Sequence, residues 1–216
     1  MTRTRYQQNL DLLKDNVIKI GEEARRSIDN AMIALENLDV DLANKVIEDD
    51  QAIDELDDSI EKCVHQLIAR QAPTAGDMRF VTSCLKISID VERMGDMAVD
   101  IAAIVKRIDG KHARPISEIV EMGAIASLML QQSIDAFKEI DPELAKETSK
   151  EDDKMDELFS STSREIIEMM TNDKTIIDNA SHLLFVLRYL ERIGDHACNI
   201  CESVVYMASG ERVYLN

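Results

Sequence analysis

The chain has 216 residues, of which 25 are lysine or arginine and 42 are aspartate or glutamate, so its formal net charge is −17 at pH 7. That balance argues against nucleic-acid binding, because a polyanion is repelled and no basic stripe is present to displace its counterions. Hydrophobic residues make up 45% of the chain, which is enough for a core and excludes an acidic disordered tail. With four scattered cysteines and no apolar signal core in the first ten residues, we expect a cytoplasmic protein that reaches membranes only through partners.

Long helices are predicted along nearly the whole chain, because only seven glycines and three prolines interrupt it and apolar residues recur at helical spacing. Asp39 and Asp141 are predicted to be N-caps, which accept hydrogen bonds from the amides of the following turn. The polar stretch 109–115, which contains a glycine and ends in a proline, is the best domain boundary. The predicted helices span 4–37, 41–70, 75–108, 116–139, 143–170 and 173–208.

The two halves of the chain repeat one another. A shift of 102 residues aligns 34–56 with 136–158, and a shift of 99 aligns Glu-Arg-Met-Gly-Asp at 92–96 with Glu-Arg-Ile-Gly-Asp at 191–195. Each half alone is too thin to bury much core. We therefore predict an all-α protein of six long helices, arranged as two tandem, sequence-related three-helix bundles packed side by side. The first is expected to span residues 1–110 and the second residues 115–216.

Glycines recur at equivalent places in the repeats. Gly21 matches Gly123, and Gly95 matches Gly194, all inside predicted helices. A glycine within a helix costs about 1 kcal/mol relative to alanine, so the repetition indicates a steric need. Either helices approach closely at these positions, which is the default interpretation, or something else lies beside the backbone.

Pairs of acidic residues four positions apart share one face of a helix. On the third and sixth predicted helices these pairs lie among apolar neighbours, so they are partly shielded and need a partner charge, hydrogen bonds or a metal. The second and fifth helices carry further pairs, and adjacent helices could bring four carboxylates together in each half. Oxygen-only ligation of that kind suits hard cations, or iron in a multinuclear cluster. The pairs are Glu92 with Asp96, Glu191 with Asp195, Asp50 with Asp54, and Asp152 with Asp156.

A structural interpretation of these carboxylates stays open. In a chain of charge −17 an acidic stripe is commonly a solvated face. Arg93 and Arg192 lie one residue from the glutamates and three from the aspartates, so ion pairs within each helix would satisfy the acidic groups. The sequence has no Gly-rich phosphate loop, Ser-His-Asp set or zinc-protease motif, so we do not expect an enzyme.

The duplicated Glu-Arg-x-Gly-Asp motif strongly resembles that of the PhoU family of phosphate-transport regulators, and the resemblance covers almost the whole chain. It implies a cytoplasmic accessory protein of the Pst phosphate ABC transporter. Through contacts with the transporter ATPase PstB and a sensor kinase such as PhoR, such proteins repress the phosphate regulon when phosphate is plentiful. Some members bind multinuclear iron or zinc clusters, or manganese and magnesium, through Glu/Asp-x-x-x-Asp pairs.

The resemblance also implies which residues hold metal. Asp100 and Asn199 occupy the turn after each motif, and Asp100 departs from the asparagine expected there. The implied ligands are Asp50, Asp54, Glu92, Asp96, Asp100, Asp152, Asp156, Glu191, Asp195 and Asn199.

The first repeat is expected to bind cations more tightly, or more of them, because it is the more anionic near the presumed site. It carries Asp57, Glu61 and Asp100 where the second repeat has Phe159, Ser163 and Asn199.

A homodimer is also expected, because long rods leave apolar flanks to cover. Two alternative functions remain: a metal-storing or metal-oxidising carboxylate bundle, which the missing Glu-x-x-His motifs disfavour, and a purely structural interaction module.

Overall fold

The computed structural model describes residues 3–71, 73–108 and 110–215, and within these ranges all regular structure is helical. Residues 1–2 and 216, at the outer ends of the two predicted domains, and Asp109, the first residue of the predicted linker, lie outside the described residues. The helices are α1 (Arg3–Asn37), α2 (Val40–Asp49), α3 (Gln51–Gln71), α4 (Ala75–Val105), α5 (Ser117–Glu139), α6 (Pro142–Thr148), α7 (Glu151–Asn172), the 3-10 helix η1 (Lys174–Ile176) and α8 (Ile177–Ser209).

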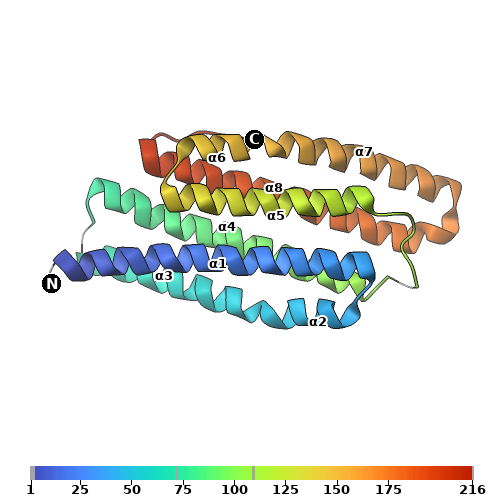
Figure 1. The fold of residues 1–216 in the computed structure, drawn as a ribbon, viewed down its shortest axis with the longest axis horizontal. Helices are drawn as coiled ribbons and strands as arrows, with labels where there is room; N and C mark the ends of the chain where they lie inside the picture. The colour runs from blue at the N-terminus through green and yellow to red at the C-terminus, as the bar shows by residue number, and fades with distance from the viewer. Residues whose placement is uncertain (1–2, 72, 109, 216) are drawn as a thin grey trace.

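The two repeats lie side by side as elongated bundles (Figure 1). In the first, α2 and α3 follow one another along α1 and α4; in the second, α6 and α7 do the same along α5 and α8. The repeats meet where α4 packs on α8 and α1 packs on α5. The all-α fold of two tandem three-helix units is therefore confirmed. No helix in the described ranges combines the length and apolarity needed to cross a bilayer.

Two of the six predicted helices are each divided. The predicted helix 41–70 breaks at Asp50 into α2 and α3, and the helix 143–170 breaks at Ser149 and Lys150 into α6 and α7. The residues at the breaks keep right-handed helical torsion angles, with φ −61° and ψ −31° at Asp50, for example. Apolar periodicity does not reveal such a break, because only the hydrogen-bond pattern changes there.

The turn before α2 and the turn before α6 are built alike. Leu38 and Ile140 adopt left-handed conformations, with φ 53° and 52°. The next residues are the predicted N-caps: Asp39 accepts a hydrogen bond from the Leu42 amide at 3.0 Å, and Asp141 likewise accepts from amides of its own helix. Both N-cap predictions are confirmed, and the shared torsion angles show that the repeat extends to turn geometry.

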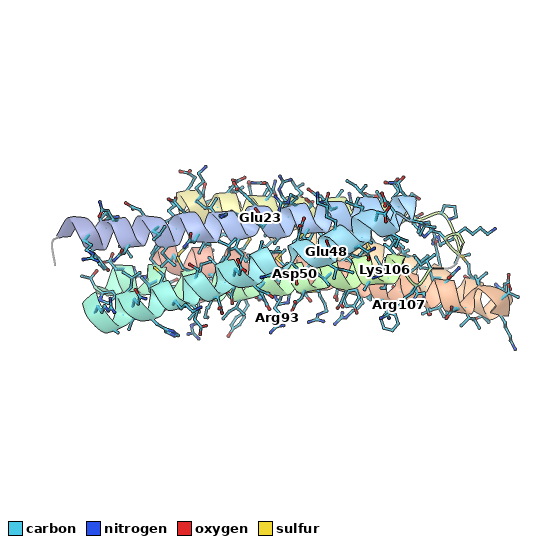
Figure 2. All side chains as sticks on the ribbon, turned by 90° about the horizontal axis from the view of Figure 1, so that it is seen from below. Glu23, Glu48, Asp50, Arg93, Lys106 and Arg107 are labelled. Carbon is cyan, nitrogen blue, oxygen red and sulfur yellow. The ribbon has the colours of Figure 1, made fainter. Side chains whose placement is uncertain are left out.

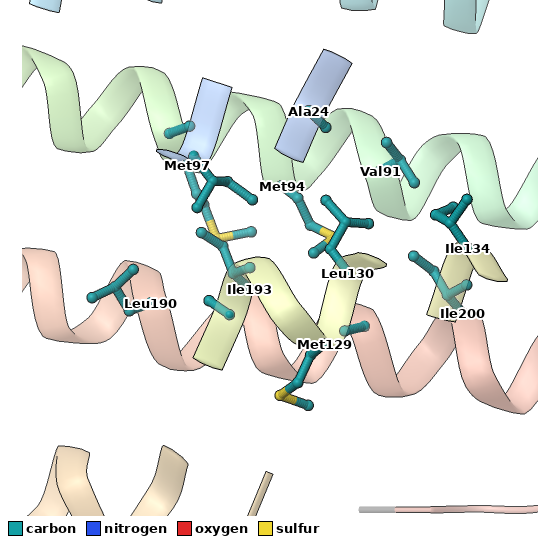
Figure 3. Packing of buried hydrophobic residues seen from close by; sticks show 14 of the residues in the cluster. Ala24, Val91, Met94, Met97, Met129, Leu130, Ile134, Leu190, Ile193 and Ile200 are labelled. Carbon is teal, nitrogen blue, oxygen red and sulfur yellow. The ribbon is translucent and has the colours of Figure 1, made fainter. Parts of the chain in front are cut away.

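A single hydrophobic core runs through both repeats. Figure 3 shows Met94 and Met97 of α4 near Ile193 of α8 and Leu130 of α5, with Ala24 of α1 above them. All five residues are buried. The predicted pair of bundles thus shares its interior, which explains why α4 and α8 are apolar on more than one face.

Two of the repeated glycines mark a close approach between the repeats. A Cβ atom on Gly21 would lie 2.6 Å from Ile134 Cγ1, and one on Gly123 would lie 2.7 Å from Met32 Cγ. Gly21 and Gly123 are 102 residues apart, and so are Met32 and Ile134. The same contact is therefore made twice with the roles reversed, which indicates an approximate twofold axis between the repeats.

Candidate metal centres

The other two repeated glycines, Gly95 and Gly194, each lie close to an aspartate of a neighbouring helix or helix break. A Cβ atom on Gly194 of α8 would lie 2.7 Å from Oδ1 of Asp152, and one on Gly95 of α4 would lie 3.5 Å from Oδ1 of Asp50. Asp50 lies at the break between α2 and α3, and Asp152 lies in the first turn of α7, just after the break at Ser149 and Lys150. Figure 2 shows Asp50 at the junction of α2 and α3, with Arg93 of α4 close by. Both glycines thus lie at close contacts: the nearest group is the Asp152 carboxylate at Gly194, whereas at Gly95 it is the Ile53 side chain at 2.9 Å, with Asp50 just beyond.

Around Asp50 the structure gathers a first acidic cluster. The pKa of Asp50 is raised to about 6, chiefly by burial and also by the charges of Asp54 and Asp96. Burial also raises the pKa of Glu92, with contributions from Asp96, Asp57 and Asp54 that Arg93 opposes. We call this set the α3–α4 cluster; it consists of Asp50, Asp54, Asp57, Glu92 and Asp96.

A second cluster forms between α7 and α8. The pKa of Asp152 is raised to about 6, chiefly by burial and also by the charges of Asp156, Asp195 and Glu191. Burial and the charge of Asp195 raise the pKa of Glu191, while Arg188 lowers it. We call this set the α7–α8 cluster; it consists of Asp152, Asp156, Glu191 and Asp195. The eight paired carboxylates predicted from sequence therefore come together as two groups of four, with Asp57 joining the first.

Arginines hold one side of each cluster. Arg93 bonds Asp96 at 2.8 Å and Glu92 at 3.4 Å, as the structural interpretation of the sequence anticipated. In the second repeat the expected arginine, Arg192, makes no such ion pair among the described residues, and Arg188 bonds Glu191 instead. The equivalent of Arg188 in the first repeat is an isoleucine, so a shift of 99 residues could not have found it.

Asp100 and Asn199 lie outside both clusters. The Asn199 side-chain amide donates to Asp90 Oδ1 at 3.2 Å, and His196 Nδ1 lies 2.8 Å from the same oxygen. Asp100 faces Tyr189, whose pKa is raised by burial and by the charge of that aspartate. These residues bind across the contact between α4 and α8, and they follow the same approximate twofold axis as the glycines.

The donor set fits a hard cation in chemistry, although the side chains are not in ligating positions. Among the described residues, no three Asp, Glu, His or Cys groups converge closely enough to hold a metal ion. Arg93 holds Asp96 in an ion pair where its side chain is 43% exposed, and Arg188 holds the largely buried Glu191 through one carboxylate oxygen. Yet Asp152 is only 7% exposed and its Oδ1 has no hydrogen-bond partner. A buried anionic oxygen without a donor is costly, and a proton or a cation would relieve that cost.

Two further acceptors have the same property. Oε2 of Glu191 and Oδ1 of Asp57 are buried without a hydrogen-bond partner. The repeat comparison marks Asp57 as an extra acid of the first repeat, but spacing along the chain does not reveal its proximity to Glu92, which lies on another helix. The other extra acid of α3, Glu61, is exposed to solvent.

Comparisons with known proteins agree with this architecture. The family model for the PhoU domain matches the chain twice, over residues 17–105 and 119–204. The phosphate-specific transport system accessory protein PhoU homologue of Clostridium acetobutylicum is 39% identical over 218 residues, covering 100% of both chains. A homologue of that name from Thermotoga maritima is 33% identical, covering 96% of this chain and 90% of the other.

Solved structures match equally well. The crystal structure of PhoU from Pseudomonas aeruginosa superposes with a TM-score of 0.93 at 31% identity, covering 95% of this chain and all of the other. The phosphate transport system regulatory protein PhoU from Streptococcus pneumoniae gives a TM-score of 0.91 at 29% identity, with 96% and 99% covered. With a duplicated domain match and full-length relatives, the chain belongs to the PhoU family.

Proposed function

We propose that this chain is a regulatory accessory protein of a phosphate-specific transport system, acting in the cytoplasm as an adaptor rather than a catalyst. The names of its relatives support the link to phosphate transport. The resemblance in sequence points to a PstB-type transporter ATPase and a PhoR-type sensor kinase as the partners. Membrane contact would pass through these partners, because the described helices include none that could span a bilayer.

The adaptor depends, in this proposal, on metal held by the two acidic clusters. The observation that carries this step is the partnerless Oδ1 of Asp152, which lies against the backbone of Gly194 at 7% exposure. Carboxylate oxygens suit magnesium, manganese or iron, and carboxylates also bind zinc. A bound cation supplies positive charge that lets several carboxylates stay ionised side by side.

In this proposal the acidic residues of each cluster ligate the metal, and the neighbouring arginines respond to its binding. Half-buried Asp50, at the break between α2 and α3, and buried Asp152, in the first turn of α7, would each supply an inner oxygen, and the other acids of each cluster would supply the rest. For Asp96 and Glu191 to join them, each must leave its arginine. Arg93 and Arg188 are more than half exposed, so they would then present free positive charge on the outer surface. Metal occupancy is thereby linked to the charge pattern that a partner meets.

The proposed ligands are the eight paired carboxylates, with Asp57 as an additional acid in the first cluster. Asp100 and Asn199 are not included, because their side chains bind across the contact between α4 and α8.

Elemental analysis of protein purified without an affinity tag or chelator tests the metal step. We expect stoichiometric iron, zinc or manganese in the wild type. A four-alanine variant in the signature pairs should lose it while remaining helical by circular dichroism. The four substitutions are Glu92→Ala, Asp96→Ala, Glu191→Ala and Asp195→Ala.

A matched control removes the same number of acids from exposed positions outside the clusters, and it should keep its metal. The control substitutions are Asp11→Ala, Glu36→Ala, Glu139→Ala and Glu211→Ala. No metal in the wild type after iron, zinc and manganese are added back would leave the carboxylates as structural ion pairs. Oxygen-dependent turnover of added iron would instead favour the storage or oxidase alternative.

The adaptor step is tested separately, by binding to the transporter ATPase. Wild-type protein should bind more tightly with metal than after chelation, and the four-alanine variant should not respond to metal. Equal binding in all three samples would favour a purely structural interaction module.

A further inference from the structure

A cavity lies where the C-terminal tail folds back on α8. After α8 ends at Ser209, residues 210–215 return along the bundle (Figure 1), and the Leu215 amide donates to Glu202 Oε1 at 3.0 Å. Between this tail, α8 and α4 lies a cavity of about 130 Å³, and a second of about 250 Å³ continues it along α4 and α8. The two share Lys86, Glu202 and Ser203. Together they have the volume of a small-molecule site.

Positive charge gathers at the tail end of this site. Lys86 of α4 and Arg212 of the tail line the smaller cavity, and both are exposed. Neither forms an ion pair or a side-chain hydrogen bond within the described part of the chain, although acidic side chains outnumber basic ones by 42 to 25. Arg79 packs beside Gly210 at the base of the tail, and its buried Nε has no hydrogen-bond partner among these residues either. Three such cations at one end of an acidic protein attract an anion.

Aromatic rings line the same cavity. Only four tyrosines occur in the chain, and two of them, Tyr206 and Tyr214, lie here. Tyr206 is half-buried, whereas Tyr214 is 86% exposed. An exposed ring beside two cations is a surface on which a planar base stacks while its phosphate pairs with lysine or arginine.

The larger cavity offers hydrogen-bond acceptors instead. Asp90 and Glu202 line it, next to Asn199. Asp90 uses Oδ1 for His196 and Asn199, and its second oxygen makes no hydrogen bond in the described ranges. Glu202 likewise uses only Oε1, for the Leu215 amide. Such oxygens repel a phosphate, but they accept hydrogen bonds from sugar hydroxyls, as an acidic residue does in dinucleotide sites.

The duplication does not account for these side chains. A shift of 99 residues takes Lys86 to Phe185. The same shift takes three residues of α8 back to apolar or basic positions of α4, with Glu202, Ser203 and Tyr206 matching Ala103, Ile104 and Arg107. The opposite end of the contact between α4 and α8 therefore lacks the lysine, the acid and the ring at these positions. Because the shared fold does not require them, they are available for binding.

We propose that this site binds a nucleotide. The phosphate group lies between Lys86 and Arg212, the base stacks on Tyr214, and the sugar hydroxyls donate to Asp90 and Glu202. Inorganic phosphate would use only the cations, and a nucleoside only the ring and the acceptors, so a nucleotide is the ligand that satisfies the whole site. This inference goes beyond the metal-dependent adaptor and does not depend on it, since none of these residues belongs to the acidic clusters.

Isothermal titration calorimetry in a chelator tests the site, because the chelator removes any contribution from metal at the acidic clusters. The probes are AMP, GMP, CMP and UMP, with the corresponding nucleosides and inorganic phosphate for comparison. We expect at least one nucleotide to bind with a dissociation constant of about 100 μM or lower. Its nucleoside and inorganic phosphate should each bind at least about tenfold more weakly.

Two substitutions separate the phosphate contact from the stacking contact. Lys86→Gln and Tyr214→Ala should each weaken nucleotide binding by about tenfold, because the first removes a charge from the phosphate and the second removes the ring. Tyr214→Phe keeps the ring and should bind within about twofold of the wild type. Both residues are exposed, and circular dichroism checks that each variant stays folded.

Matched controls lie at the other end of the contact between α4 and α8. Lys106→Gln removes an exposed lysine just after α4, and Phe185→Ala removes a ring that is 56% exposed, so both should bind the nucleotide as the wild type does. A wild type that binds none of the four nucleotides at about 5 mM would overturn the proposal. Inorganic phosphate that binds as tightly as every nucleotide, or unchanged binding by Lys86→Gln or Tyr214→Ala, would overturn it as well.

Discussion

Replacing Gly194 with alanine should reveal how tightly the α7–α8 cluster is built. The new methyl group would lie 2.7 Å from Asp152 Oδ1 and 3.5 Å from Met155 Cγ. The first distance is well inside van der Waals contact, and Asp152 is buried in the first turn of α7. The aspartate must therefore shift by several tenths of an ångström, or α8 must move away from α7.

Two opposing effects set the magnitude. Alanine in place of glycine within a helix gains about 1 kcal/mol, and overpacking of a close contact costs about 1–3 kcal/mol. Gly76 supplies the reference, because it lies in the first turn of α4 with no atom within 4 Å of its Cβ position. Gly76→Ala should gain stability, whereas Gly194→Ala should gain nothing or lose about 2 kcal/mol. The gap of about 1–3 kcal/mol corresponds to roughly 3–9 °C in melting temperature for a chain of this size.

Thermal unfolding followed by circular dichroism at 222 nm, in a chelator, measures this gap without any contribution from metal. Gly95→Ala should fall between the other two, because its nearest neighbour is the end of the Ile53 side chain at 2.9 Å and the Asp50 oxygen is at 3.5 Å. If Gly194→Ala melts at the same temperature as Gly76→Ala, the aspartate is not packed against the α8 backbone and the argument fails.

Three further predictions concern charge. Asp152→Asn should raise the melting temperature of the metal-free protein at pH 7 by a few degrees, because burial raises the pKa of this carboxyl and the amide avoids the cost of ionising it. The same variant should lose metal on elemental analysis. A fall in melting temperature would contradict the first expectation. Asp54→Ala should remove more metal than Asp156→Ala, since the first cluster has an extra acid, and equal losses would refute the asymmetry. The Tyr6 hydroxyl donates to Asp77 at 2.9 Å, and burial together with this carboxylate raises the pKa of Tyr6 to about 12. The bond therefore stabilises the fold fully below pH 10, and this stabilisation is lost as the pH rises through 12. Tyr6→Phe should lower the free energy of unfolding in urea by about 1 kcal/mol at pH 8 and should reduce the loss of stability at alkaline pH; an unchanged loss at alkaline pH would argue against the bond.

Sequence periodicity was sufficient for the helices and for the duplication, because both depend on patterns local to the chain. The caps at Asp39 and Asp141 were equally predictable, since a cap acts on the next turn. The breaks at Asp50 and after Thr148 were not, because they change hydrogen bonds without changing the apolar pattern. Those breaks nevertheless lie at or just before the first acid of each cluster, Asp50 and Asp152.

The candidate site shows the same division. The i, i+4 acid pairs were readable because one helix face carries each of them. Contacts between helices were harder: Asp57 reaches the vicinity of Glu92 from α3, and Asp100 turns instead to Tyr189 across the contact between repeats. Arg188 could not be found by comparing the repeats, because only one of them has an arginine there.

The contact between the repeats has a consequence for how this protein changes over time. Each half of the chain supplies a glycine that accommodates a side chain of the other half, and a side chain that packs on the other half's glycine. Geometrically, the molecule is a symmetric pair of subunits joined into one polypeptide. Unlike two identical subunits, the two halves of one polypeptide can carry different residues at equivalent positions, as Arg114 bonded to Glu165 shows where the first repeat has Leu12 and Cys63.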